Sequence, residues 1–116
     1  MAEFKITTET KGEVTVVRTL GYLDDEGGKQ VKEFCEQLLE AGKNRFVLNL
    51  AGTPVINSTG LSMVLDIVVK TIDYHDGKVA VTGLTKLTRT ALQMTGVLTL
   101  CPAFETEQES IEAVSE

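Results

Sequence analysis

The feature that most constrains the fold of this 116-residue chain is a short apolar run, Phe46-Val47-Leu48-Asn49-Leu50. No two-residue turn flanks the run, so it does not form half of a tight hairpin. Such a run is typical of a strand that is buried on both faces, as the strands of parallel sheets are. We therefore predict a central strand here, in a sheet that needs helices to cover it.

Segments with a helical spacing of apolar residues stand on both sides of this strand. They lie between Glu26 and Gly42 and over residues 58–75, 85–95 and 107–114. The first follows a group of acids and ends at a glycine, as the helix dipole and the left-handed C-terminal cap favour. The second ends at Asp76-Gly77. We expect four helices.

Strand-like segments alternate with these helices. An N-terminal hairpin is predicted from residues 4–9 and 14–18, and further strands from residues 79–82 and 97–104, the last interrupted by Pro102. The order is ββαβαβαβα, which implies a single α/β domain over residues 1–116. Its central sheet should be mostly parallel, with the hairpin at one side and the helices packed on it.

The charge balance and the apolar pattern exclude several classes of function. Seventeen acidic residues against eleven basic ones give a net charge of −6, whereas binding to a nucleic acid backbone needs clustered lysine and arginine. No stretch reaches the roughly 20 apolar residues that cross a bilayer, and the N-terminus lacks the apolar core of a signal peptide. We expect a cytoplasmic protein without a nucleic acid or membrane partner.

Nothing in the sequence indicates catalysis. Cys35 and Cys101 each lie alone in apolar patterns, without a second cysteine or histidine at metal-binding spacing, so they are interpreted as small buried hydrophobic residues. No nucleophile and base pair, metal cluster or cofactor loop stands out. The expectation is a non-enzymatic protein with no cofactor and no metal.

The most informative segment is Val55-Ile56-Asn57-Ser58-Thr59-Gly60-Leu61, where two hydroxyls stand at the start of the second long helix. The first N–H groups of a helix lack intrahelical partners and its dipole favours negative charge, so a phosphate on Ser58 would be held by the backbone. The simpler interpretation is that Asn57 or Ser58 only caps the helix. Gly60 favours the first interpretation slightly, because a glycine in the first turn suggests a close approach to the backbone.

This segment resembles the Asp-Ser-Ser/Thr-Gly-Leu motif of the STAS family, specifically its bacterial anti-sigma factor antagonists. Gly21-Tyr22-Leu23-Asp24 resembles the family's Gly-x-Leu/Ile-Asp element before the first helix, and Thr95-Gly96-Val97 resembles the step after the third. The order and spacing of these elements match over nearly the whole chain. One position departs from the motif: Asn57 stands where the family has aspartate.

The resemblance implies a partner-switching cycle. An anti-sigma factor that is itself a serine kinase would phosphorylate Ser58, and only the unphosphorylated chain would bind the kinase and free the sigma factor. A serine phosphatase would reset the cycle. The resemblance also implies that Asp24 lies near the Ser58 hydroxyl and that Asn57, Ser58, Thr59 and Gly60 contact the partner. The alternative is a non-cycling STAS scaffold or ligand-sensing interaction module.

A helical wheel of the helix that follows Ser58 suggests a second part of the partner surface. Leu61, Val64, Leu65, Val68 and Ile72 form the stripe expected to face the core. Met63, Ile67 and Tyr74 fall on an adjoining face and are predicted to form an apolar docking strip. The alternative is that neighbouring helices cover this face.

Overall fold

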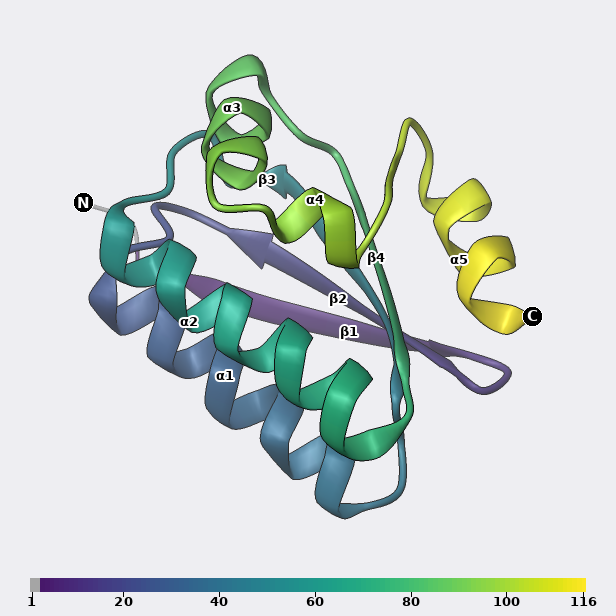
Figure 1. The fold of residues 1–116 in the computed structure, drawn as a ribbon. Coiled ribbons are helices and arrows are strands. Elements are labelled where there is room, and N and C mark those ends of the chain that lie inside the picture. The colour runs from purple at the N-terminus through teal and green to yellow at the C-terminus, as the bar shows by residue number, and fades with distance from the viewer. Residues whose placement is uncertain (1–2) are drawn as a thin grey trace.

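A five-stranded sheet forms the centre of the fold, which the computed structural model describes over residues 3–116 (Figure 1). Its strands are β1 (Lys5–Lys11), β2 (Val14–Leu20), β3 (Arg45–Gly52), β4 (Lys78–Thr82) and β5 (Ala103–Phe104). They lie side by side in chain order, β1 antiparallel to β2 and every later pair parallel. The predicted hairpin and the predicted central position of residues 46–50 are both confirmed.

The helices include all four that the sequence predicts. They are α1 (Asp25–Glu40), α2 (Ser58–Val69) with its π-helical continuation η1 (Lys70–Tyr74), α3 (Lys86–Met94), the short α4 (Val97–Leu100) and α5 (Glu107–Ser115). Asp76, which follows η1, adopts a left-handed conformation with φ of 51° and ends that helix. Among residues 3–116, no helix is both long and apolar enough to cross a membrane.

The predicted strand over residues 97–104 is wrong in its first half. Val97–Leu100 forms the helical turn α4, which begins after Gly96 at φ +80° and is closed by a bond from the Cys101 N–H to the Val97 carbonyl. A run of four apolar residues fits a buried helical turn as well as a buried strand, because periodicity cannot separate them at this length. The strand β5 begins only after Pro102.

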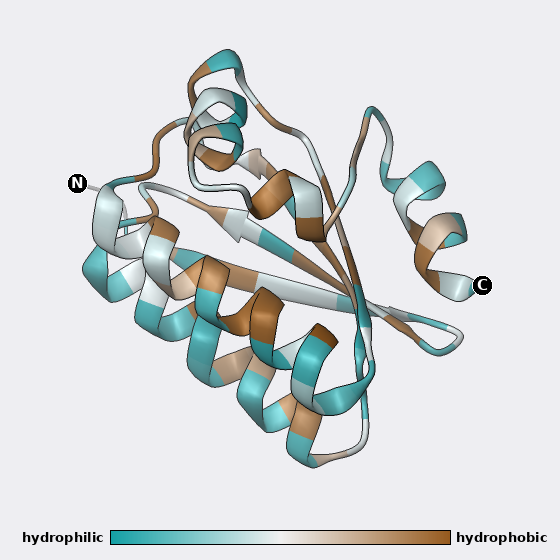
Figure 2. Ribbon diagram, in the orientation of Figure 1, coloured by the Kyte–Doolittle hydropathy of each residue, from teal (hydrophilic) through white to brown (hydrophobic). Residues whose placement is uncertain are grey.

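The two faces of the sheet carry cores of different size, because strand side chains alternate between faces. On one face, Val17, Phe46, Leu48 and Val81 pack beneath α1, α2, α3 and α4. On the other face, a smaller cluster consists of Val14, Val16, Val47 and Ala80 of the sheet with Val114 of α5, the helix that covers them. Figure 2 shows apolar residues, in brown, along the helices; most of them pack into these cores, whereas Leu87 and Met94 on α3 are exposed.

Both cysteines lie in the larger core, as the sequence predicts. Cys35 and Cys101 are fully buried and form no disulfide. Burial raises the pKa of each thiol to about 12, because the apolar surroundings disfavour the thiolate. The cysteines therefore pack as hydrophobic residues and are unreactive at neutral pH.

A charged network fastens α5 to the sheet. The Arg18 guanidinium donates two hydrogen bonds to the Glu107 carboxylate, at 2.9 and 2.7 Å, and a third to Glu9 at 2.8 Å. Asn49 donates a further bond to Glu107 at 2.8 Å. The bonds from Arg18 and Asn49 stabilise the ionised carboxylate and lower the pKa of Glu107. One partly buried carboxylate at the start of α5 thus joins that helix to β2 and β3.

The network makes stability depend on pH. Because the folded state lowers the pKa of Glu107, its stabilisation is fully present above the unfolded value near 4.5 and is lost as the pH falls through the lower folded pKa. We expect Glu107→Gln to lower the free energy of unfolding by about 1 kcal/mol at pH 7 and by much less near pH 3. Urea unfolding at both pH values measures this.

The matched control is Glu105→Gln, which changes the same chemical group at an exposed position just before α5. It should leave stability unchanged at both pH values. An equal loss at pH 3 and pH 7 for Glu107→Gln would contradict the role assigned to the ionised carboxylate.

Candidate functional site

The starts of α1 and α2 lie side by side because the loops before them pair with each other. The Leu23 N–H donates to the Val55 carbonyl and the Asn57 N–H donates to the Leu23 carbonyl, both at 3.1 Å. These bonds form a short parallel bridge between Leu23 and Ile56. The loops that follow the carboxyl ends of β2 and β3 therefore place the N-termini of α1 and α2 next to each other.

Two glycines allow the helices to come close at this point. A Cβ on Gly60 would overlap the Leu23 carbonyl group, and a Cβ on Gly28 would lie 2.9 Å from the Gly60 Cα. Either position therefore excludes every residue larger than glycine unless the backbone shifts. The close approach inferred from Gly60 is confirmed, and what approaches is the start of α1.

Asn57 performs two tasks in the turn Asn57–Gly60, which we call the Ser58 turn. Its side-chain oxygen accepts a hydrogen bond from the Gly60 N–H at 2.8 Å, which makes it the N-cap of α2. Its amide nitrogen donates to the Asp25 carboxylate at 3.2 Å. A carboxylate at position 57 could keep the cap but could not donate to Asp25.

Ser58 is exposed at the first position of α2, and Thr59 beside it is also exposed. The cap is Asn57, so the Ser58 side chain is not needed for that purpose. The only hydrogen bond that Ser58 makes to a side chain within residues 3–116 goes through its carbonyl, which accepts from the Ser62 hydroxyl at 3.0 Å. The Ser58 hydroxyl is therefore open to another protein.

The surroundings of the Ser58 turn are acidic. Asp24 caps α1 by accepting from the Gly27 N–H at 3.0 Å, and its carbonyl lies 3.1 Å from where a Cβ of Gly60 would be. Asp25 and Glu26 follow in the first turn of α1 and are exposed. The first turns of α1 and α2 contain no lysine or arginine. A negative charge added to Ser58 would therefore be repelled by the carboxylates of Asp24, Asp25 and Glu26.

The docking strip predicted along α2 is corrected at Ile67, which is only 2% exposed and belongs to the core. The buried positions of α2 and its continuation η1 are Gly60, Val64, Ile67, Val68 and, in η1, Thr71. Two of these, Gly60 and Thr71, carry no strong apolar signal on a helical wheel. The buried face is therefore rotated about the helix axis relative to the stripe that the larger apolar residues predict.

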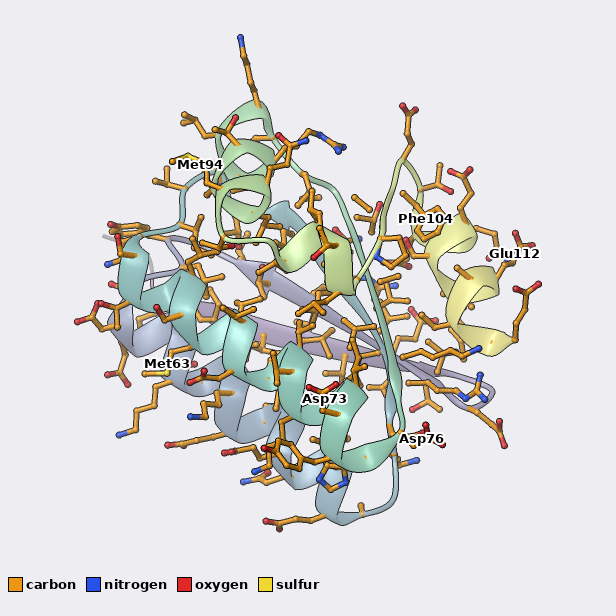
Figure 3. All side chains as sticks on the ribbon, in the orientation of Figure 1. Met63, Asp73, Asp76, Met94, Phe104 and Glu112 are labelled. Atoms are coloured by element: carbon orange, nitrogen blue, oxygen red, sulfur yellow. The ribbon has the colours of Figure 1, made fainter. Side chains whose placement is uncertain are left out.

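Met63 is the member of the strip that remains near the site. It is half-buried, and its Cβ and Cγ would each lie 3.0 Å from a Cβ on Gly28, so its side chain covers the close approach of α1 and α2. Figure 3 shows Met63 beside the start of α2, facing outward between the two helices. Tyr74 is exposed but lies at the far end of η1.

Two exposed apolar side chains beside the site were not predicted from the sequence. Tyr22 is 47% exposed and Val55 is 44% exposed, and their loops are joined by the bond from Leu23 to Val55. Loop residues have no periodicity that would separate an exposed side chain from a buried one. The pairing of the two loops, which is a long-range contact, brings them to the same end of the molecule as Ser58.

Comparison with protein families matches residues 5–110 to the STAS domain. Comparison with curated protein sequences finds no match. Solved structures with the same fold include an anti-sigma factor antagonist of Mycobacterium paratuberculosis, with 18% identity and a TM-score of 0.85, covering 98% of this chain and 96% of that one.

Two further solved structures have similar folds. A candidate anti-sigma factor antagonist of Thermotoga maritima has 20% identity and a TM-score of 0.86, covering 96% of this chain and 95% of that one. The phosphorylated form of the Bacillus cell fate determinant SpoIIAA has 20% identity and a TM-score of 0.74, covering 95% and 99%. These likenesses show that the fold is shared.

The glycine contact can be tested by adding one methyl group. Alanine normally stabilises a helix by about 1 kcal/mol relative to glycine, but in Gly60→Ala the new Cβ would meet the Leu23 carbonyl. We expect Gly60→Ala to lower the free energy of unfolding by about 2–3 kcal/mol in urea. Ser62→Ala, at an exposed position of the same helix, should change it by less than about 0.5 kcal/mol. A more stable Gly60→Ala protein would refute the contact.

The bond between Asn57 and Asp25 can be tested by a double-mutant cycle. Asn57→Asp keeps the cap but places two carboxylates where one amide donated to one carboxylate, so we expect a loss of about 1 kcal/mol at pH 7 and low salt. Asp25→Asn should recover most of this loss when combined with Asn57→Asp. If the two changes are additive in thermal or urea unfolding, the side chains do not interact.

Proposed function

The chain belongs to the STAS domain family, and we propose that it is an anti-sigma factor antagonist whose partner binding is switched by phosphorylation of Ser58. The observation that carries this proposal is an exposed hydroxyl at the first position of α2, beside a cap that Asn57 already supplies. Proteins described as anti-sigma factor antagonists have similar structures. One of the similar structures is that of SpoIIAA in its phosphorylated form.

The partner is an anti-sigma factor that is also a serine kinase, and it binds the unphosphorylated chain. Its contact surface consists of the Ser58 turn, the neighbouring Asp24, and Met63. Tyr22 and Val55 add exposed apolar surface next to the turn. Burying a neutral hydroxyl that is hydrogen-bonded to the partner costs far less desolvation free energy than burying a charged group in the same place.

Phosphorylation breaks this interface through charge. A phosphoserine carries about −1.5 to −2 charges at pH 7, and the first turns of α1 and α2 offer it no lysine or arginine. The free N–H groups of α2 can hold the phosphate in the isolated protein. In the complex, however, the dianion would be buried beside Asp24, Asp25 and Glu26, at a cost of several kcal/mol unless the partner supplied cations. A serine phosphatase restores the binding form.

The direct test uses the cognate serine-kinase anti-sigma factor. With ATP, we expect one phosphate per chain by intact mass, mapped to Ser58, none on Ser58→Ala and an unchanged yield on Thr59→Ala. Ser58→Asp should weaken binding to the kinase by about a hundredfold or more, because it places a charge in the interface. Ser115→Asp, which makes the same change on the other side of the sheet, should bind normally.

The outcomes separate this proposal from its alternative. Binding that is as tight for Ser58→Asp as for the natural chain would contradict the switch. Binding without any phosphate on Ser58 would favour the non-cycling interaction module, in which Asn57 replaces the family's aspartate because no phosphate is exchanged.

A further inference from the structure

The sheet has one long open edge, which the proposed function does not use. Strand β1 pairs with β2 along its whole length, and within residues 3–116 no other strand pairs with its second side. The exposed positions of β1 include Thr8 and Thr10. Open edges of this length invite pairing with another chain unless side chains oppose it.

The hairpin geometry determines which backbone groups face the open edge. Lys11 and Val14 close a two-residue turn, Gly12-Glu13, with Gly12 at φ +63°, so they must exchange backbone hydrogen bonds. Bonded and non-bonded pairs alternate along an antiparallel ladder. The free N–H and C=O groups therefore belong to Ile6, Thr8 and Thr10.

The charges on β1 select one register for pairing with a second copy. The free N–H and C=O groups belong to even-numbered residues. They can form hydrogen bonds between two copies only in registers that place an even-numbered residue opposite an even-numbered residue. A pairing centred on Thr8 sets Lys5 opposite Lys11, and one centred on Glu9 sets that residue opposite itself. A pairing centred on Ile6 sets Glu9 opposite Glu3. All three place like charges together.

A pairing centred on Thr7 has the opposite effect. It sets Lys5 opposite Glu9 and Glu3 opposite Lys11, and the two-fold symmetry produces each pair twice. These are non-bonded pairs of the ladder, in which side chains lie closest. The Glu9 side chain is 42% exposed, so it can also accept Lys5 of the second copy, beside its existing partners Lys11 at 2.7 Å and Arg18 at 2.8 Å in the same chain. A pairing centred on Thr10 also sets Glu9 opposite Lys11, but its strand overlap is only residues 9–11.

We propose that the open edge of β1 binds the same edge of a second copy of this chain, antiparallel, with Thr7 on the two-fold axis. The two sheets then form one continuous sheet, and each edge satisfies the other's free backbone groups. The interface is isologous, so it closes at a dimer and does not propagate. It goes beyond the proposed function and does not depend on it.

Charge exchange provides the first test. In sedimentation equilibrium from micromolar to millimolar concentration, we expect the natural chain to dimerise and Lys5→Glu or Glu9→Lys alone to raise the dissociation constant by about tenfold or more. An equimolar mixture of the two variants should dimerise again, because all exchanged pairs are then opposite in charge. Lys43→Glu, an exposed position outside the sheet, is the control of equal net charge.

The register provides the second test. Under mild oxidation, Thr7→Cys should form a disulfide-linked dimer rapidly, because position 7 meets itself across the axis. Thr10→Cys, equally exposed on the same strand, should not, because position 10 lies opposite Phe4. A monomer at every concentration would overturn the proposal. So would a natural-chain dimer that the mixed variants fail to restore, or equal crosslinking at positions 7 and 10.

Discussion

The contact on which the site depends is the approach of the α2 backbone to Leu23. The Leu23 N–H and C=O bind Val55 and Asn57, and Gly60 packs directly against the same carbonyl. Without this contact the two helices would start from separate loops, and Ser58 would have no acidic neighbours from α1. Gly28 and Gly60 leave the space for this contact because neither has a Cβ, so a larger residue at either position would displace the Ser58 turn.

Different parts of the sheet make different contacts: the strand ends, the two faces and the free edge. The ends of β2 and β3 present the Ser58 turn, and one face supports the large core beneath α1 to α4. The other face supports α5, which Arg18 and Glu107 fasten at its start. The free edge of β1 remains available for pairing. A partner at the Ser58 turn and a second copy at β1 would therefore use different backbone groups.

The elements that the sequence predicts well are those with a strong local signal. The run over residues 46–50 and the capped helix after Ser58 each specify their own conformation through burial pattern and capping chemistry. The prediction failed at residues 97–100, where four apolar residues suit either a strand or a helical turn. It failed also at Ile67, because the buried face of α2 and η1 includes Gly60 and Thr71, which add no large apolar side chain to the pattern.

The individual contacts between the starts of α1 and α2 could not be predicted from the residue pattern. The bond from Asn57 to Asp25, the meeting of Gly28 with Gly60 and the exposure of Tyr22 beside Val55 arise only when α1 and α2 lie together. Single-sequence reasoning identifies a helix start but not its neighbour. The acidic surroundings of Ser58, which determine how added charge acts there, come from the neighbour.

The central claim is that the paired starts of α1 and α2 form the surface that a partner contacts. The most direct measurement is titration of the nitrogen-15-labelled chain with the unlabelled anti-sigma factor, followed by amide chemical shifts. The account predicts the largest changes at Leu23–Asp25 and Asn57–Gly60, with Ile111 and Val114 on α5 unaffected. Changes confined to α5, with unchanged amides at the Ser58 turn, would contradict it.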